Sequence, residues 1–267
     1  MNVTKVLPLL ALFPLQLLAA EILVISSYHQ TNLWDQSYSA GLQQYLKGEH
    51  HISHLYLDTK RQPHQDPERL VSQGMAAYQA RKPALVVLGD DNAINALARP
   101  IAALGTPVVF LGMNENPRPK GRVGQTRVSS RQFTDYRRWQ EAVLTSQQNG
   151  YQALFLGLYH TLIDEQGRHV DEQQVLAWTS SHNTVPLFGF WEFAVGPGRT
   201  IGGLVLDGRT QGEKAAELAN AILAGTAPGA LSPRAALRGE YLFSKSELAR
   251  WQLEAPSRWQ GRVTYVD

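Results

Sequence analysis

Residues 21–36, EILVISSYHQTNLWDQ, join a short apolar run to a cluster of polar and aromatic side chains. The run Ile22 to Ile25 is typical of a strand that is buried on both faces of a sheet. Asn32 then stands where a helix cap is expected, and an apolar series at helical spacing follows it: Trp34, Tyr38, Leu42 and Tyr45. This stretch therefore predicts a strand, a polar tip and a helix, which together form the first unit of an α/β fold.

The same unit recurs along the first half of the chain. Three further apolar runs predict strands, and the spacing between them leaves room for one helix each time: Ile52 to Leu57, Ala84 to Leu88 and Val108 to Leu111. Asp66-Pro67 opens one of these helices, with proline at the first helical position. Alternating strands and helices of this kind predict a parallel sheet that is covered by helices on both faces.

Polar side chains follow each of the four predicted strands. These tips are Ser26 to Asp35, Asp58 to Arg61, Gly89 to Asn92 and Gly112 to Asn114. Right-handed crossovers place the carboxyl ends of parallel strands at one edge of the sheet, which is where open α/β sheets bind ligands. Each tip alone is also explained by turn chemistry, with Asp90 or Asp91 as a helix cap. Their convergence favours a ligand site.

The second half repeats the pattern less regularly. A strand is predicted at Ala153 to Leu158, a helix around Asp171 to Ser181 and a short strand at Pro186 to Phe188. Thr210 and Glu213 form the pattern of a capping box for a helix that stops at Gly225. Two lobes, each with a parallel sheet edge, predict a cleft between them that holds a small ligand.

Several stretches, taken in order from about residue 22 to residue 251, resemble a bacterial family of ABC-transporter-type substrate-binding proteins with the type I periplasmic-binding fold. They are SSYHQTNLWDQSYSAGL, LDTKRQP, LGDDNA, VVFLGMN, YHTLIDEQGRHV, PLFGFWEFAVGPGRTIGGLVLDGRTQG and YLFSKSELARW. Relatives of this family also serve as sensing domains of bacterial histidine kinases. The resemblance implies an α/β, two-lobed clamshell that closes on a small molecule and presents it to a membrane permease or a histidine kinase. It does not imply catalysis.

One departure from the family pattern concerns the second lobe. Members usually carry a further strand and helix between the segments matching Asn114 and Trp139, where this chain has only ENPRPKGRVGQTRVSSRQFTDYRR. We therefore expect a trimmed second lobe. The expected organisation is a signal peptide at residues 1–20, a first α/β lobe at 21–118 plus about 200–243, and a smaller α/β lobe at 119–199 plus about 244–267.

Carried over position by position, the resemblance implies a set of cleft residues that combine aromatic faces with hydrogen-bonding groups. Stacking faces suit a sugar, an organic side chain or an ammonium, and carboxylates accept from hydroxyl or amine groups, so we expect a polar organic ligand. Two alternatives stay open: Trp34 as a core residue, and Glu192 as a surface ion-pair partner of Arg199. The set is Tyr28, His29, Trp34, Asp35, Asp90, Asp91, Asn92, Asn114, Tyr159, His160, Trp191 and Glu192.

Composition excludes several other functions. The 267-residue chain carries a net charge of only +2, so its charge does not indicate binding to nucleic acid or to an anionic membrane surface. The absence of cysteine excludes disulfides and thiolate chemistry. The first twenty residues have the one-lysine, apolar and small-residue pattern of a secretory signal, and no later segment is long and apolar enough to span a bilayer. We expect export to a bacterial periplasm.

We expect no enzyme activity, no metal and no cofactor. The motifs GxSxG, HExxH and GxxxxGK[ST] are missing from the sequence. The histidines at positions 50, 51, 54 and 64 offer zinc-type ligands, but their position before a strand favours a solvated turn. The leading hypothesis is a periplasmic solute-binding protein. The alternatives are an accessory or sensory protein that acts through protein contact without ligand closure, and a periplasmic enzyme on a related scaffold with His160 as a base.

Overall fold

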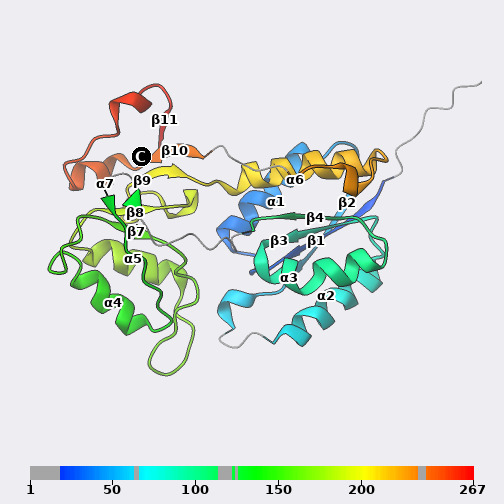
Figure 1. The fold of residues 1–267 in the computed structure, drawn as a ribbon, viewed down its shortest axis with the longest axis horizontal. Coiled ribbons are helices and arrows are strands. Elements are labelled where there is room, and N and C mark those ends of the chain that lie inside the picture. The colour runs from blue at the N-terminus through cyan, green and yellow to red at the C-terminus, as the bar shows by residue number, and fades with distance from the viewer. Residues whose placement is uncertain (1–18, 63–65, 114–121, 124–125, 234–238) are drawn as a thin grey trace, which may run out of the picture.

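The computed structural model describes residues 19–62, 66–113, 122–123, 126–233 and 239–267 (Figure 1). Most of the expected signal peptide and the candidate residue Asn114 lie outside the described residues. Over the part of the chain that is described, we find no helix with the length and apolar character needed to cross a membrane. The elements form two lobes (Figure 1).

A four-stranded parallel sheet forms the centre of the first lobe. Its order is β2-β1-β3-β4, so the strand that opens the sequence lies inside the sheet. The four predicted strands are confirmed within one residue at each end: β1 is Glu21–Ser26, β2 is His51–Tyr56, β3 is Leu85–Gly89 and β4 is Val108–Leu111.

Alternate side chains of this sheet build two apolar layers. Ile22 and Val24 of β1 face helices α1 (Leu33–Tyr45) and α6 (Gly208–Leu223). Leu23 and Ile25 face helices α2 (Pro67–Arg81) and α3 (Asp90–Ala103) on the other side. Figure 1 shows these two helix pairs on opposite faces of the sheet. The predicted caps Asn32 and Asp66 are confirmed, since each side chain accepts a backbone N–H of the helix that it precedes.

Helices α1 and α6 approach each other through glycine. A Cβ atom added at Gly212 of α6 would lie 2.0 Å from the carbonyl oxygen of Tyr38 in α1. A Cβ atom added at Gly41 of α1 would lie 2.2 Å from the carbonyl oxygen of Arg209 in α6. The two backbones are therefore in direct contact, and α6 is fixed to the first lobe.

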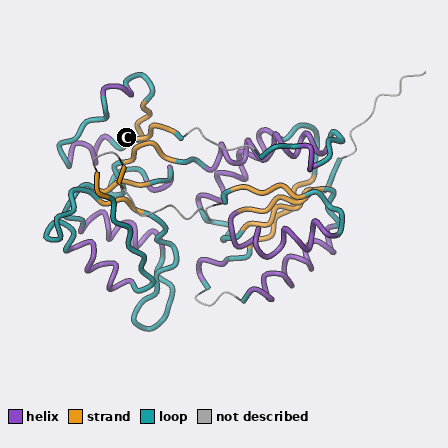
Figure 2. The backbone as a smooth tube through the Cα atoms, viewed as in Figure 1, coloured by secondary structure: helices purple, strands orange, loops and turns teal. Residues whose placement is uncertain are grey.

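The second lobe is smaller and contains more loop (Figure 2). In the described residues its parallel pair is β7 (Leu154–Leu156) with β8 (Leu187–Gly189), beside a sheet of order β11-β10-β9. This two-stranded pair, against four strands in the first lobe, agrees with the expected trimming. Its other elements are β5 (Arg122–Val123), β6 (Thr126–Arg127), α4 (Tyr136–Leu144), α5 (Glu172–His182), β9 (Gly202–Val205), β10 (Glu240–Phe243), α7 (Lys245–Arg250) and β11 (Val263–Tyr265).

Four short 3₁₀ helices complete the described elements. They are η1 (Thr59–Arg61), η2 (Glu192–Ala194), η3 (Pro228–Ala230) and η4 (Ser257–Trp259). The first of them forms the tip that follows β2, and the second follows β8. Both strand ends therefore turn at once into a short helix, which holds the following side chains close to the sheet edge.

The structure differs from expectation around α6. The predicted capping box at Thr210 is wrong, because Asp207 caps the helix and accepts from both the backbone N–H and the hydroxyl of Thr210, at 2.6 and 2.7 Å. Residues 200–243 also do not lie together in the first lobe. Helix α6 packs on α1, but β9 pairs with β10, which pairs on its other side with β11.

Candidate ligand-binding site

The tips that follow β1, β2 and β3 are tied together by hydrogen bonds. The Ser27 hydroxyl donates to the carbonyl of Gly89 at 2.6 Å, and the Thr59 hydroxyl donates to the carbonyl of Ser27 at 2.8 Å. The side-chain amide of Asn92 donates to the Thr59 hydroxyl at 2.8 Å. Asn92 therefore serves to hold two tips in register, and the predicted convergence of the tips is what the structure shows.

A small cavity lies where this edge meets the second lobe. Its volume is about 10 Å³, roughly what one water molecule needs. Five of its lining residues belong to the predicted set, and Lys60, Leu158 and Phe193 do not. The predicted residues that line it are Tyr28, Trp34, Asp90, His160 and Trp191.

The other predicted residues lie around the cavity or away from it. The Asp35 side chain is buried near Tyr38 and Lys60. Tyr159 is buried in the second-lobe core, and its ring stacks on His160 with 4.2 Å between centroids. Asp91, half-buried, follows Asp90 in the first turn of α3 and raises the pKa values of Tyr28 and Asp90 by its charge.

Glu192 is not paired with Arg199, and it does not line the cavity. Its carboxylate accepts from the Ser37 hydroxyl of α1 and, at 3.1 Å, from the backbone N–H of Gly208 at the start of α6. Arg199, the expected ion-pair partner, donates instead to the carbonyl of Phe193. Glu192 therefore joins the second lobe to both helices on one face of the first sheet.

Buried polar atoms with no hydrogen-bond partner among the described residues gather at the cavity. They are the indole Nε1 of Trp34, Oδ2 of Asp90 and Nδ1 of His160. The Trp34 indole still acts on the Asp90 carboxyl, whose pKa it lowers against the larger effect of burial. A buried polar atom without a partner costs about 1–3 kcal/mol. Trp34 and Asp90 come from the first lobe and His160 from the second, so residues of both lobes that line the cavity carry such atoms.

The backbone at Asp90 is also unusual. This non-glycine residue begins α3 with a φ of 65°, in the left-handed region. Residues held in such conformations cost about 1–3 kcal/mol and cluster at binding and active sites. The conformation brings the carboxylate against Gly112, where a Cβ atom would lie 2.8 Å from Oδ1.

Burial perturbs the charged groups of this region. Burial raises the pKa of Asp35 to about 7, although the nearby Lys60 ammonium opposes the shift. Burial and the Asp35 charge raise the pKa of Asp90 well above its usual value. Burial lowers the pKa of Lys60 to about 8, against the pull of Asp90 and Asp35. The pKa of His160 is lowered well below its usual value by burial, so this imidazole is neutral.

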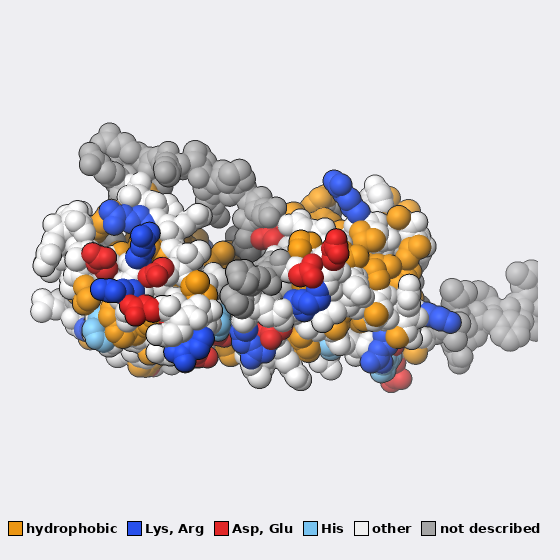
Figure 3. All heavy atoms as spheres, turned by 90° about the horizontal axis from the view of Figure 1, so that it is seen from below, with side chains coloured by type: hydrophobic (Ala, Val, Ile, Leu, Met, Phe, Trp, Pro, Cys, Tyr) orange, Lys and Arg blue, Asp and Glu red, His pale blue; other side chains and the backbone are white. Residues whose placement is uncertain are grey.

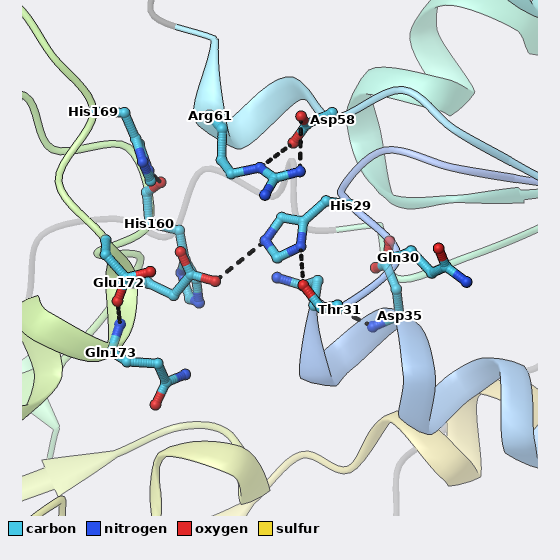
Figure 4. A network of polar contacts seen from close by, with 12 residues as sticks. His29, Gln30, Thr31, Asp35, Asp58, Arg61, His160, His169, Glu172 and Gln173 are labelled. Atoms are coloured by element: carbon cyan, nitrogen blue, oxygen red, sulfur yellow. Dashed lines mark hydrogen bonds and ion pairs between the residues drawn. The ribbon is translucent and has the colours of Figure 1, made fainter.

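A direct contact between the lobes lies beside the cavity. Nε2 of His29, in the loop after β1, lies 3.2 Å from Oε1 of Glu172 at the start of α5, and both side chains are buried. Nδ1 of His29 pairs with the Thr31 hydroxyl at 2.9 Å. Figure 4 shows His29 directed from the first lobe to Glu172 in the second. His29 is thus placed at the lobe interface and does not line the cavity.

Opposite pH dependences are expected from Asp35 and Lys60. Native Asp35 holds a proton between its ordinary pKa of 3.8 and about 7 where the unfolded chain does not, so stability falls as pH rises through that window. Native Lys60 loses its proton between about 8 and 10.5 where the unfolded chain keeps it, so stability rises with pH there. The contribution of the pair to stability is lowest between about pH 7 and 8.

Urea unfolding at about pH 5, 7.5 and 9.5 checks this expectation. Asp35→Asn should weaken the fall in the free energy of unfolding between the first two values, and Lys60→Met should weaken the rise between the last two. Equal slopes in the wild type and in both variants would contradict it.

Solved structures of other proteins have a fold similar to that of this chain. No protein-family model matches the chain, and no curated protein matches it. A conserved domain protein from Vibrio cholerae matches with a TM-score of 0.62 at 12% identity, over 92% of this chain and 99% of that one. The ligand-free, open structure of a substrate-binding protein with adhesive properties from Clostridium difficile matches with a TM-score of 0.55 at 12% identity, over 93% and 99%.

The ABC domain from Streptococcus pneumoniae, in complex with L-Trp, matches with a TM-score of 0.63 at 13% identity, over 92% of this chain and 99% of that chain. Two of the three structures are thus substrate-binding or ligand-bound proteins. At such low identity the likeness shows the fold alone. It confirms the predicted two-lobed, type I periplasmic-binding arrangement.

Proposed function

We propose that this chain is an exported solute-binding protein that captures a small polar organic ligand between its lobes. One observation supports this proposal above the others: unpartnered buried polar atoms of Trp34, Asp90 and His160 meet at one cavity, from two lobes. Such atoms gain a hydrogen bond when a ligand supplies the missing partner. The solute-binding role also agrees with two of the similar structures, one a substrate-binding protein and the other a domain in complex with L-Trp.

The chemistry of the cavity selects a ligand with a flat or apolar part and an amine. Tyr28, Trp34 and Trp191 offer ring faces, and the Trp191 ring stacks on Phe193 with 6.1 Å between centroids. The Asp90 carboxyl supplies an acceptor for an ammonium or hydroxyl group, and an ammonium beside it would lower its raised pKa and favour the charged carboxylate. An amino acid with an aromatic side chain fits both features, and the similar pneumococcal domain is described with L-Trp.

Such a ligand enters by separation of the lobes, because a 10 Å³ cavity is far smaller than an amino acid. The contact between His29 and Glu172 then forms as the lobes close. The closed form would be presented to an ABC-type permease or to a sensor kinase. Acidic and basic side chains are scattered among hydrophobic and other atoms over the visible face of both lobes in Figure 3.

A second candidate function is protein contact without ligand closure. The small cavity favours it, as does an apolar group on the second lobe: the rings of Phe155, Phe188 and Phe190 stack in series, and Phe155 is 63% exposed. Exposed apolar groups of this kind mark interaction surfaces.

Native mass spectrometry of the chain purified from periplasm, followed by a thermal-shift screen of amino acids, amines, sugars and nucleosides, distinguishes the two functions. We expect a mature chain that starts near Glu21, with a copurified small molecule or a shift of several degrees, because a ligand that binds only the folded state raises its stability. A folded protein with neither a bound mass nor a shift would favour the protein-contact function.

Asp90→Asn is the variant that places the ligand in the cavity. Asparagine keeps the shape and tolerates the left-handed backbone, but it removes the charge. We expect affinity to fall about 10- to 150-fold, the range for a hydrogen bond to a charged group. The exposed Glu165→Gln is the control and should bind like the wild type. Full affinity in Asp90→Asn would place the ligand elsewhere.

A further inference from the structure

Among the residues that line the small cavity, Lys60 has the position that is hardest to explain by folding alone. It belongs to η1, beyond the end of β2, and only 8% of it is exposed. Its ammonium lies 3.4 Å from the centre of the Tyr28 ring. Lysine is almost never fully buried unless its charge is paired.

This ammonium has no ion-pair partner within the described ranges. No carboxylate oxygen there lies within 4.0 Å of it, although Asp90, Asp35 and Glu172 all act on it electrostatically. Neighbouring Arg61, by contrast, makes a two-bond ion pair with Asp58, at 2.7 and 3.0 Å. The two basic residues of one tip thus have different environments: one is paired near the surface, and the other is buried at the cavity with a ring face beneath it.

We propose that Lys60 determines ligand specificity: its ammonium binds an anionic group of the ligand, so that the cavity selects zwitterions over simple amines. This inference rests on the proposed function. A ligand with only an ammonium would place a second positive charge beside Lys60 in a site of low dielectric, where like charges repel strongly. A zwitterion supplies a partner to each side, an ammonium for Asp90 and an anion for Lys60.

The energetic size of this selection follows from the same reasoning. A site built to bond a polar group rejects an analogue that lacks the group, because its own buried group then stays unpaired. Loss of one hydrogen bond to a charged group corresponds to about a 10- to 150-fold loss of affinity. We expect the wild type to bind L-tryptophan at least about 10-fold more tightly than tryptamine, and L-phenylalanine at least about 10-fold more tightly than phenethylamine.

Isothermal titration of these two probe pairs against the wild type, Lys60→Met and Lys60→Arg tests the proposal. Methionine keeps the apolar stem and removes the charge, so the preference for the zwitterion should disappear. Arginine keeps the charge and should retain the preference. Thermal melts confirm folding, and Lys60→Gln replaces the methionine variant if that variant does not fold.

The outcomes separate this inference from the function on which it rests. Equal affinity of the wild type for both members of a pair, or an unchanged preference in Lys60→Met, overturns the role of Lys60 and leaves ligand capture standing. A copurified ligand without an anionic group does the same. A wild type that binds none of the probes and no compound of the wider screen overturns both proposals.

Discussion

Gly212→Ala is expected to lower the free energy of unfolding by about 1–2 kcal/mol, the overpacking cost less the gain in helix propensity. The added Cβ would lie 2.0 Å from the Tyr38 carbonyl oxygen and 2.6 Å from the Leu42 nitrogen, and both are backbone atoms that cannot turn aside. Alanine favours a helix over glycine by about 1 kcal/mol. Separating two packed helices costs more, since overpacking typically costs about 1–3 kcal/mol and occasionally exceeds that range.

Gly229→Ala is the matched control for this substitution. Its added Cβ meets no atom within 4 Å, so the free energy of unfolding should stay within about 0.5 kcal/mol of the wild type. Urea unfolding of the two variants beside the wild type measures the difference. Equal stability of all three proteins would contradict the direct backbone contact between α1 and α6.

Trp34→Ala is expected to cost about 3–5 kcal/mol of stability, the usual range for removal of a large buried ring. Trp34 is only 6% exposed and packs in the same apolar layer as Tyr38, yet its indole nitrogen is one of the unpartnered atoms at the cavity. The ring therefore belongs to the core and also lines the cavity, and its contact with a ligand stays a prediction.

Trp34→Phe separates these two roles. Phenylalanine keeps most of the packing, so the free energy of unfolding should fall by no more than about 1.5 kcal/mol. It cannot donate a hydrogen bond, and ligand-induced thermal shifts should shrink or vanish. Unchanged shifts in a stable Trp34→Phe variant would mean that the indole serves the core alone.

The first lobe could be predicted from sequence because its signals are local. Short runs such as Leu85 to Leu88, buried on both faces, and caps such as Asn32 depend on neighbouring residues. The cap of α6 was missed for a related reason: Thr210 is a good cap by type, but Asp207 precedes it and takes the donors of Thr210.

The place of Lys60 at a cavity could not be predicted, because residues of the opposite lobe form part of that cavity. A lysine in a turn is ordinarily solvated, and His160 and Trp191, which line the same cavity, lie far along the chain. The same holds for Glu192, whose partners Ser37 and Gly208 belong to two different helices. The chemical types of the cavity residues could be listed from sequence, but their pairings required the fold.

The packing of α6 on α1 also sets an order of folding. The side-chain hydrogen bonds of Asn220 to Tyr45 and Lys47 span 175 and 173 residues of chain. As the chain emerges from the ribosome, one face of the first sheet has β1, β3 and α1 but still lacks α6, and contacts of such long range form slowly. The lobe that begins first is therefore completed late, and its uncovered face over Tyr38 and Leu42 is the surface that a holding chaperone would meet.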